Sequence, residues 1–228
     1  MQVTFDIIDD AGQQPLAVDF SELVVAGWAG RDQAVIEHHI EELAAIGVPR
    51  PSATPLFYRI AVNQLTQAER VQVVGAQTSG EVEAFVFNAG GESYVSVASD
   101  HTDRELEAHS VALSKQACVK PLARQAWRLA DVADYWDELV IRSWIDEGGR
   151  TVAYQEGPLA SLRSPADLIA TYTGGGARLS DGTGMTCGTV AVQGGIRPAS
   201  AFTMELFDPR RGRAIRHAYA IDVLPVVA

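Results

Sequence analysis

Cysteine, basic charge and long apolar runs are all scarce in this sequence. Two cysteines in 228 residues are too few for a disulfide framework, and the first residues have neither the basic stretch nor the apolar core of a signal peptide. No apolar run in the sequence approaches the roughly 20 residues that span a bilayer. The net charge of −11 repels phosphate backbones and anionic lipid. We therefore expect a cytoplasmic protein that binds neither nucleic acid nor membrane.

The chain is rich in apolar residues and in short strand-like segments. Its 47% hydrophobic content over 228 residues is enough to bury one sizeable core. The turns NAGG and DPRRG, together with the lack of regular helix–strand alternation, favour a β-rich α+β fold with mostly antiparallel strands. Segments with β-branched residues between Gly, Pro or Asp clusters predict strands at 2 to 8, 22 to 28, 56 to 62, 82 to 87, 93 to 98, 151 to 154, 185 to 192, 202 to 207 and 214 to 223.

Two helices and one boundary are predicted from periodicity and from proline. Apolar residues recur on one helical face over residues 31 to 46, and a shorter helix is expected over 165 to 171 with Ser164 as its N-cap. The segment 128 to 147 mixes both periodicities and is left unassigned. A proline-rich stretch at 47 to 55 reads as a linker. We expect one globular unit with a small N-terminal α/β lobe, residues 1–55, and a β-rich lobe, residues 56–228.

Three carboxylates are predicted to converge. Glu81 and Glu83 stand two apart at the start of an apolar strand, so both point to the same face. A hairpin through the turn NAGGE returns Asp100 beside them. Like charges this close repel unless a proton or cation lies among them, and an all-oxygen site suits Mg²⁺ or Mn²⁺. The alternative is that the two glutamates are solvated on the polar face of the strand.

The run DHTDRELE from Asp100 to Glu107 resembles the NDVSARDWQ segment of the fumarylacetoacetate hydrolase family, in which this aspartate and an upstream ExE pair bind a divalent metal. Residues 24 to 60 are similar to that family's entry strand, HxxE helix and PxLFxK-like strand. Lys115 matches the lysine of GKxFDxFxPLGP, and Thr189 matches the threonine of TGTP. The matches follow family order from about residue 22 to 224, and they resemble a divergent, DUF2848-like branch.

This resemblance implies a mixed β-sandwich roll or barrel of the fumarylacetoacetate hydrolase type, and a set of site residues. The implied metal ligands are Glu81, Glu83 and Asp100. The implied catalytic residues are His39, Glu42 and Lys115, and the implied substrate-binding residues are Arg104 and Thr189. The alternatives for Lys115 and Arg104 are a solvated charge and a structural ion pair. The sequence departs from the family pattern at Arg59, Ser99, Glu107 and Val190.

The HxxE pattern occurs in two registers. His39 with Glu42 fits the family's distance to the following Gly slightly better, and His38 with Glu41 is the other register. A carboxylate three residues from a histidine on a helix can orient the imidazole and raise its basicity, so such a dyad can activate water. The alternative is an acidic, solvated helix face.

Two functions follow as hypotheses. The first is a Mg²⁺-dependent hydrolase or lyase acting on a small 2-oxo acid by C–C bond hydrolysis, decarboxylation or dehydration, because a metal held by carboxylates stabilises the negative charge of an enolate. The second is a non-catalytic scaffold or binding domain, which the departures from the family pattern favour. In both cases we expect a homodimer, with Trp136 or Trp144 exposed at its interface.

Overall fold

The computed structural model describes residues 1–10, 12–45 and 50–227, without the side chains of residues 39, 42, 43 and 45. Its larger sheet has eight strands in the order β2-β1-β12-β9-β8-β15-β3-β4. The bounds of these strands are β1 Gln2–Asp9, β2 Gly12–Asp19, β3 Glu22–Gly27, β4 Leu56–Ile60, β8 Val82–Ala89, β9 Glu92–Ser99, β12 Gln125–Arg128 and β15 Thr183–Thr186.

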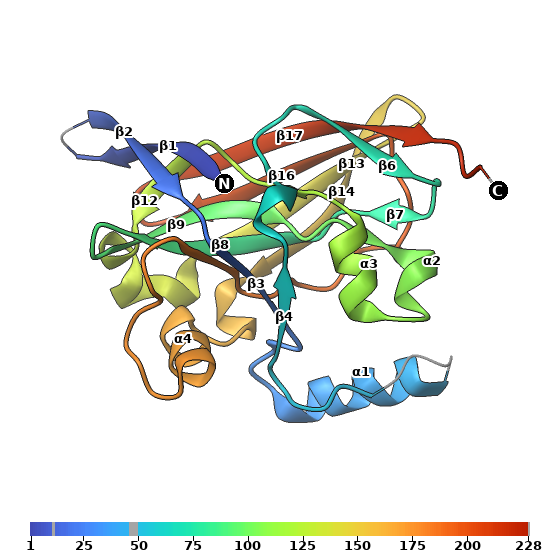
Figure 1. The fold of residues 1–228 in the computed structure, drawn as a ribbon, viewed down its shortest axis with the longest axis horizontal. Helices are drawn as coiled ribbons and strands as arrows, with labels where there is room; N and C mark the ends of the chain where they lie inside the picture. Colours follow the sequence, from blue (N-terminus) through green and yellow to red (C-terminus); the bar gives the residue numbers. More distant parts are fainter. Residues whose placement is uncertain (11, 46–49, 228) are drawn as a thin grey trace.

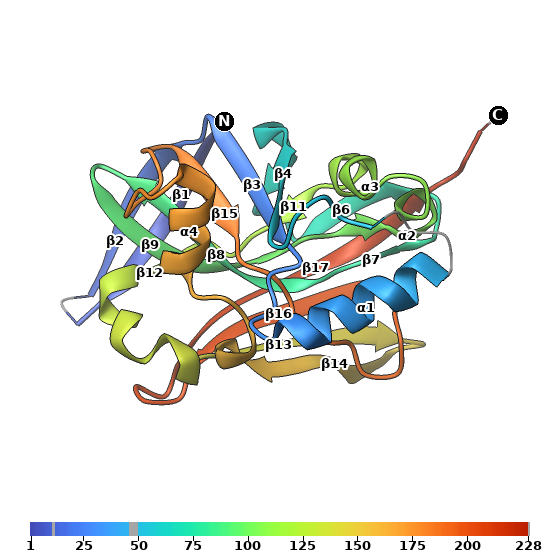
Figure 2. The same ribbon diagram turned by 90° about the horizontal axis from the view of Figure 1, so that it is seen from below.

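A second sheet of five strands lies against the first, and the two form the layers seen in Figures 1 and 2. Its order is β14-β13-β16-β17-β6, with bounds β14 Arg150–Pro158, β13 Val140–Glu147, β16 Ala201–Asp208, β17 Arg213–Leu224 and β6 Arg70–Val74. Two short pairs complete the strands: β7 Thr78–Ser79 with β10 Thr102–Asp103, and β5 Leu65–Thr66 with β11 Lys120–Pro121. Parallel pairs such as β1 with β12 and β6 with β17 stand among antiparallel ones, so the β-rich, mixed architecture predicted from the sequence is confirmed.

The helices lie around the sheets (Figure 2). Their bounds are α1 Gln33–Ala45, α2 Arg104–Glu107, α3 Val111–Ala117 and α4 Pro165–Thr173, with 3-10 turns η1 Val62–Gln64, η2 Leu129–Asp131, η3 Ala133–Glu138 and η4 Leu159–Ser161. Helix α1 confirms the helix predicted over 31 to 46, although it begins only at Gln33, and residue 46 lies outside the described residues. Helix α4 begins after Ser164, whose hydroxyl accepts a hydrogen bond from the Asp167 amide at 3.2 Å, as an N-cap does. No helix in the described part of the chain is long and apolar enough to cross a membrane.

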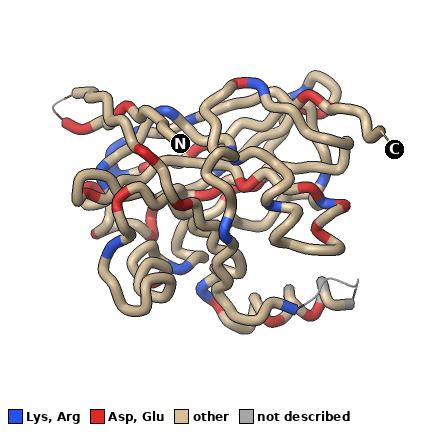
Figure 3. The backbone as a smooth tube through the Cα atoms, in the orientation of Figure 1, with Lys and Arg blue, Asp and Glu red and all other residues tan. Residues whose placement is uncertain are grey.

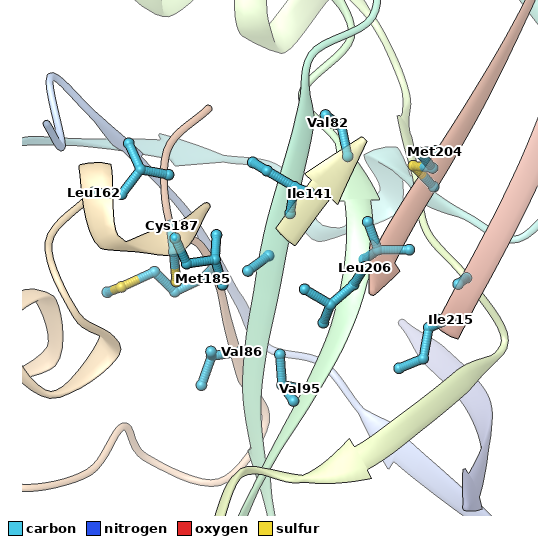
Figure 4. Close-up of a cluster of buried hydrophobic side chains, with 14 of the residues drawn as sticks. Val82, Val86, Val95, Ile141, Leu162, Met185, Cys187, Met204, Leu206 and Ile215 are labelled. Carbon is cyan, nitrogen blue, oxygen red and sulfur yellow. Dashed lines mark hydrogen bonds between the residues drawn. The ribbon is translucent and has the colours of Figure 1, made fainter. Parts of the chain in front are cut away.

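Most of the core lies between the two sheets. Side chains of β8 and β9 such as Val82, Val86 and Val95 meet Ile141 and Leu206 from the smaller sheet (Figure 4). The opposite face of the larger sheet packs a second, aromatic cluster around Phe5, Phe20, Phe85 and Phe87. Strand β8 is therefore covered on both faces, which explains why its sequence is a continuous apolar run rather than an alternating one.

Two expectations about the segments are corrected by the structure. The predicted strand at 185 to 192 is wrong after Thr186, where β15 ends, because Gly188 turns the chain out of the sheet with a φ of +87°. The unassigned segment 128 to 147 holds two 3-10 turns followed by β13. Trp136 in the second turn is buried in the core, so its expected exposure at an interface is also wrong.

Strands before and after residue 55 belong to the same sheet. β3 pairs with β15 in parallel and with β4 in antiparallel orientation, so the two predicted lobes share one hydrogen-bonded layer. This agrees with one globular unit, and the lobe boundary at residue 55 stays a prediction.

Lys and Arg positions are interspersed with Asp and Glu positions along the described chain (Figure 3).

Candidate metal centre

Three carboxylates meet where the hairpin of β8 and β9 ends. The register pairs Val82 with Ser99, and the Asp100 amide donates a hydrogen bond to the Glu81 carbonyl at 2.9 Å. One carboxylate oxygen from each of Glu81, Glu83 and Asp100 lies within 4.8 Å of the others. The convergence expected from the spacing of these residues is therefore present.

The two inner carboxylates are almost completely removed from water. Glu83 is 3% exposed and Asp100 is 0% exposed. Burial raises the pKa of Glu83 to about 8, and the negative charges of Asp100 and Glu81 act in the same direction. Burial also acts to raise the pKa of Asp100, but the ammonium groups of Lys115 and Lys120 outweigh it and lower that pKa. Glu83 thus binds a proton much more tightly than the neighbouring Asp100 does.

Lys115 is buried inside the cluster. It lies in α3, and its Nζ contacts Asp100 Oδ2 and lies 3.6 Å from Glu81 Oε2. Burial acts to lower the pKa of Lys115, but the charges of Asp100 and Glu81 outweigh burial and raise it well above the ordinary value. The side chain therefore stays an ammonium ion. This excludes the solvated surface charge that was the alternative for this residue.

Lys120 is a site residue that the sequence analysis missed. It is fully buried in β11, with its Nζ 3.2 Å from Asp100 Oδ1. The same Nζ donates to the carbonyls of His101 at 2.6 Å, Cys118 at 3.2 Å and Lys115. Burial lowers the pKa of Lys120, and the charge of Asp100 opposes that shift. The signal in the sequence was a single lysine inside the run CVKPLA, where a solvated charge is out of place.

Arg104 begins α2 and holds the outermost carboxylate. Its guanidinium lies 3.1 Å from Glu81 Oε1 and 2.8 Å from Glu107 Oε2, and its Nε donates to Ser79 Oγ at 2.7 Å. Burial acts to lower the pKa of Arg104, and the two glutamates outweigh burial and raise it. These contacts fit the structural ion pair that was the alternative. Binding of substrate by Arg104 stays a prediction.

The loop after β15 closes the cluster from another side. The Gly188 amide donates to Glu83 Oε2 at 2.7 Å. The Thr189 hydroxyl donates to the Val82 carbonyl at 2.7 Å and accepts from Gln155 Nε2 at 2.8 Å. Thr189 thus fixes the loop against β8, and its role in substrate binding stays a prediction. Neither the Gly188 amide nor Gln155 was identified from the sequence, since both act only across strands far apart in the chain.

His101 points away from the carboxylates, as expected for the residue after a ligand on extended backbone. Its ring lies between Tyr219 Oη and Thr78 Oγ1, each at 2.9 Å. Because the Tyr219 hydroxyl donates to Ser99 Oγ at 2.9 Å, the ring donates from Nδ1 and accepts at Nε2. Burial lowers the pKa of His101 to about 3, so the ring is neutral. The neutral ring stabilises the end of the hairpin through these two hydrogen bonds.

The expected histidine dyad is only partly described. The side chains of His39 and Glu42 lie outside the described residues. His38 and Glu41, the other register, lie exposed on α1. Both registers of the HxxE pattern therefore stay open, and so does the role of either dyad in activating water.

The described residues fit a small divalent cation. Every donor of the cluster is a carboxylate oxygen, the type preferred by Mg²⁺ and Mn²⁺. Asp100 Oδ1 is buried without a hydrogen bond, although Lys120 Nζ lies 3.2 Å away, because the N–H groups of that lysine point to carbonyls. An orphaned, ionised oxygen in a buried site is the kind of atom that a metal ion satisfies.

Comparisons with known proteins place the chain in a family. A family model described as "Protein of unknown function (DUF2848)" matches residues 26–219. No curated protein matches the chain in sequence.

Solved structures resemble the chain in fold. A 2-keto-3-deoxy-D-arabinonate dehydratase complexed with magnesium and 2,5-dioxopentanoate has a TM-score of 0.64 at 16% identity, covering 96% of this chain and 79% of that one. The yeast protein ynq8, of the fumarylacetoacetate hydrolase family, has a TM-score of 0.64 at 14% identity, covering 92% and 96%. A candidate fumarylpyruvate hydrolase from Burkholderia cenocepacia has a TM-score of 0.61 at 16% identity, covering 99% and 96%. The predicted fold of the fumarylacetoacetate hydrolase type is confirmed.

Proposed function

The chain belongs to the DUF2848 family, and from its carboxylate cluster we propose that it is a divalent-metal-dependent hydrolase or lyase acting on a small 2-oxo acid. The observation that carries this proposal is the convergence of Glu81 with the buried Glu83 and Asp100, in which Asp100 Oδ1 has no hydrogen bond. Glutamates on the solvated face of a strand, the alternative considered above, would stay exposed to water. Burying two carboxylates beside a third is costly unless cations offset their repulsion.

The residues divide into ligands and positive charges. Glu81, Glu83 and Asp100 would hold Mg²⁺ or Mn²⁺, which when bound polarises a keto oxygen and favours an enolate. Lys115 stays protonated, so it acts as a fixed positive charge toward the substrate rather than as a base. Arg104 keeps Glu81 in place through their ion pair. A base, if the reaction uses one, has to come from another group, and the HxxE helix is the candidate.

The chemistry of a fold neighbour supports the same class of substrate. A structure of similar fold holds magnesium together with 2,5-dioxopentanoate, a 2-oxo acid. Another fold neighbour is described as a candidate fumarylpyruvate hydrolase. For this chain, C–C hydrolysis, decarboxylation and dehydration are therefore the reactions to screen, and their products distinguish them: two acids, carbon dioxide, or a dehydrated acid.

One observation favours the second candidate, a non-catalytic scaffold. Each carboxylate already has a partner within the protein: Glu81 has Arg104, and Glu83 has the Gly188 amide. Asp100 has Lys115. A cluster with these partners can persist without metal. The two candidates differ in whether metal and a 2-oxo acid bind at all.

Calorimetric titration of oxalate, a planar mimic of the pyruvate enolate, separates these candidates. We expect oxalate to bind in the presence of Mg²⁺ and not in the presence of EDTA. Glu83→Gln should abolish this binding because it removes a ligand charge. Glu92→Gln, which makes the same change at an exposed side chain of β9, should leave it unchanged. Absence of binding with both Mg²⁺ and Mn²⁺ would reject the enzyme in favour of the scaffold.

A further inference from the structure

Lys120 is charged because of the number of acceptors around it. Its Nζ donates to three backbone carbonyls, those of His101, Cys118 and Lys115. A neutral amine has two N–H donors and an ammonium ion has three. Three acceptors in a fully buried position therefore require the ammonium form. The parallel pairing of Lys120 with Leu65 on β5 fixes the backbone from which the side chain extends.

This charge acts on a metal ligand without binding it through a hydrogen bond. Nζ lies 3.2 Å from Asp100 Oδ1 and donates to three carbonyls, which leaves Oδ1 without a hydrogen bond of its own. Lys120 is 0% exposed and lies behind Asp100, while Lys115 contacts the other oxygen of that carboxylate. A substrate that reached the cluster from solvent would therefore not contact Lys120. The contribution of Lys120 is a fixed positive charge.

With Lys120 included, the positive and negative charges of the cluster almost cancel. The ionisable groups in mutual contact are the carboxylates Glu81, Glu83, Asp100 and Glu107 and the cations Arg104, Lys115 and Lys120. With Glu83 ionised, as a bound metal requires, their sum is one excess negative charge, and the divalent cation turns it into one excess positive charge. A monoanionic 2-oxo acid then restores neutrality, and the dianion oxalate is attracted by the same positive charge. Because charges interact strongly in a buried site, each of these steps affects the next.

We propose that Lys120 is a positioning residue that makes the divalent cation and the anionic substrate bind as a pair. With Lys120 charged, the cation alone is held weakly, and the loaded site attracts a carboxylate. Without this charge, the cation alone would bind more tightly and the loaded site would be neutral. The anion would then bind more weakly. This inference rests on the proposed function, because it requires that metal and a 2-oxo acid bind.

The coupling is measurable as a ratio of affinities. Mn²⁺ is titrated into the protein with and without oxalate, bound metal is read by electron paramagnetic resonance, and free concentrations are corrected for the complex that forms in buffer. We expect oxalate to raise the Mn²⁺ affinity of the unmodified protein by about tenfold or more, within the usual range of coupling. Lys120→Gln, which is neutral but keeps two N–H donors for the carbonyls, should reduce this factor to below about threefold.

The direction of each affinity separates a charge effect from a structural one. In Lys120→Gln we expect tighter Mn²⁺ binding alone and weaker oxalate binding at saturating Mn²⁺, whereas a damaged site loses both. Lys120→Arg keeps the charge and should retain the coupling if it folds, which thermal unfolding checks. If the unmodified protein binds metal and oxalate independently, or if Lys120→Gln weakens both together, this inference fails while the proposed function stands. If the unmodified protein binds no oxalate with metal, the proposed function itself fails.

Discussion

Glu83 is a charged residue inside the apolar run of β8, and its environment links metal binding to pH. In the metal-free protein its pKa is raised from the ordinary 4.5 to about 8, mainly by burial. The folded state thus binds this proton more tightly than the unfolded state. The stability that this group contributes is fully present below its unfolded pKa and is lost as the pH rises through about 8.

A metal ion reverses this dependence, because it needs the ionised carboxylate. We expect the increase in Tm caused by Mg²⁺ to be small at pH 6 and to grow steadily up to about pH 8.5, as measured by thermal unfolding with and without the metal. In Glu83→Gln the Mg²⁺ effect should be absent at every pH. A Mg²⁺ effect that is equal at pH 6 and pH 8.5 would show that Glu83 gives up no proton to the metal.

At the scale of elements, β15 packs closely against the aromatic cluster beside the site. Gly184 lies in the middle of this strand between β8 and β3. A Cβ at this position would lie 2.4 Å from Phe85 Cζ and 3.0 Å from Phe20 Cε1. The aromatic cluster therefore occupies the space that any side chain at 184 needs.

We expect Gly184→Ala to destabilise the protein by about 1 to 3 kcal/mol, the usual cost of overpacking a core. Urea unfolding measures the change. Phe85→Leu shortens the opposing side chain. The double variant should therefore lose less free energy of unfolding than the two single variants lose together. An additive result would mean that the two residues do not compete for the same space.

At the scale of the molecule, the outer face of the five-stranded sheet is where we expect a second copy to bind. On β13 the side chains of Ser143 and Ile145 are buried toward the core. Trp144 between them is half-buried and points outward. It is thus the tryptophan that keeps the predicted interface role, whereas Trp136 loses it.

Light scattering at micromolar concentration tests this association. We expect the mass of a dimer for the unmodified protein and a shift toward the monomer in Trp144→Glu, because a charge on an interface core is costly. Val35→Glu, at a residue of α1 that is 65% exposed, should not change the mass. A monomeric unmodified protein would end the dimer hypothesis.

Much of this protein was readable from sequence because the deciding interactions are local. β-Branched residues between turn residues predicted β8, β9, β16 and β17 to within a few residues. Two-residue spacing placed Glu81 and Glu83 on one face, and a short hairpin turn brought Asp100 beside them. Strands with weaker patterns, such as β2 with its Pro15 and the short β6, were missed because pairing with neighbours rather than propensity stabilises them.

By itself, the sequence determined the strand-rich fold and the carboxylate triad, since both depend on periodicity and on residues close together in the chain. Only the tertiary structure decided what surrounds the triad. Lys120 reaches Asp100 across 20 residues, the Gly188 amide reaches Glu83 across 105, and Trp136 turned inward. The balance of charge, the burial and the proton affinity of the site arise from these long-range contacts, because electrostatic energy depends on distance and burial in space.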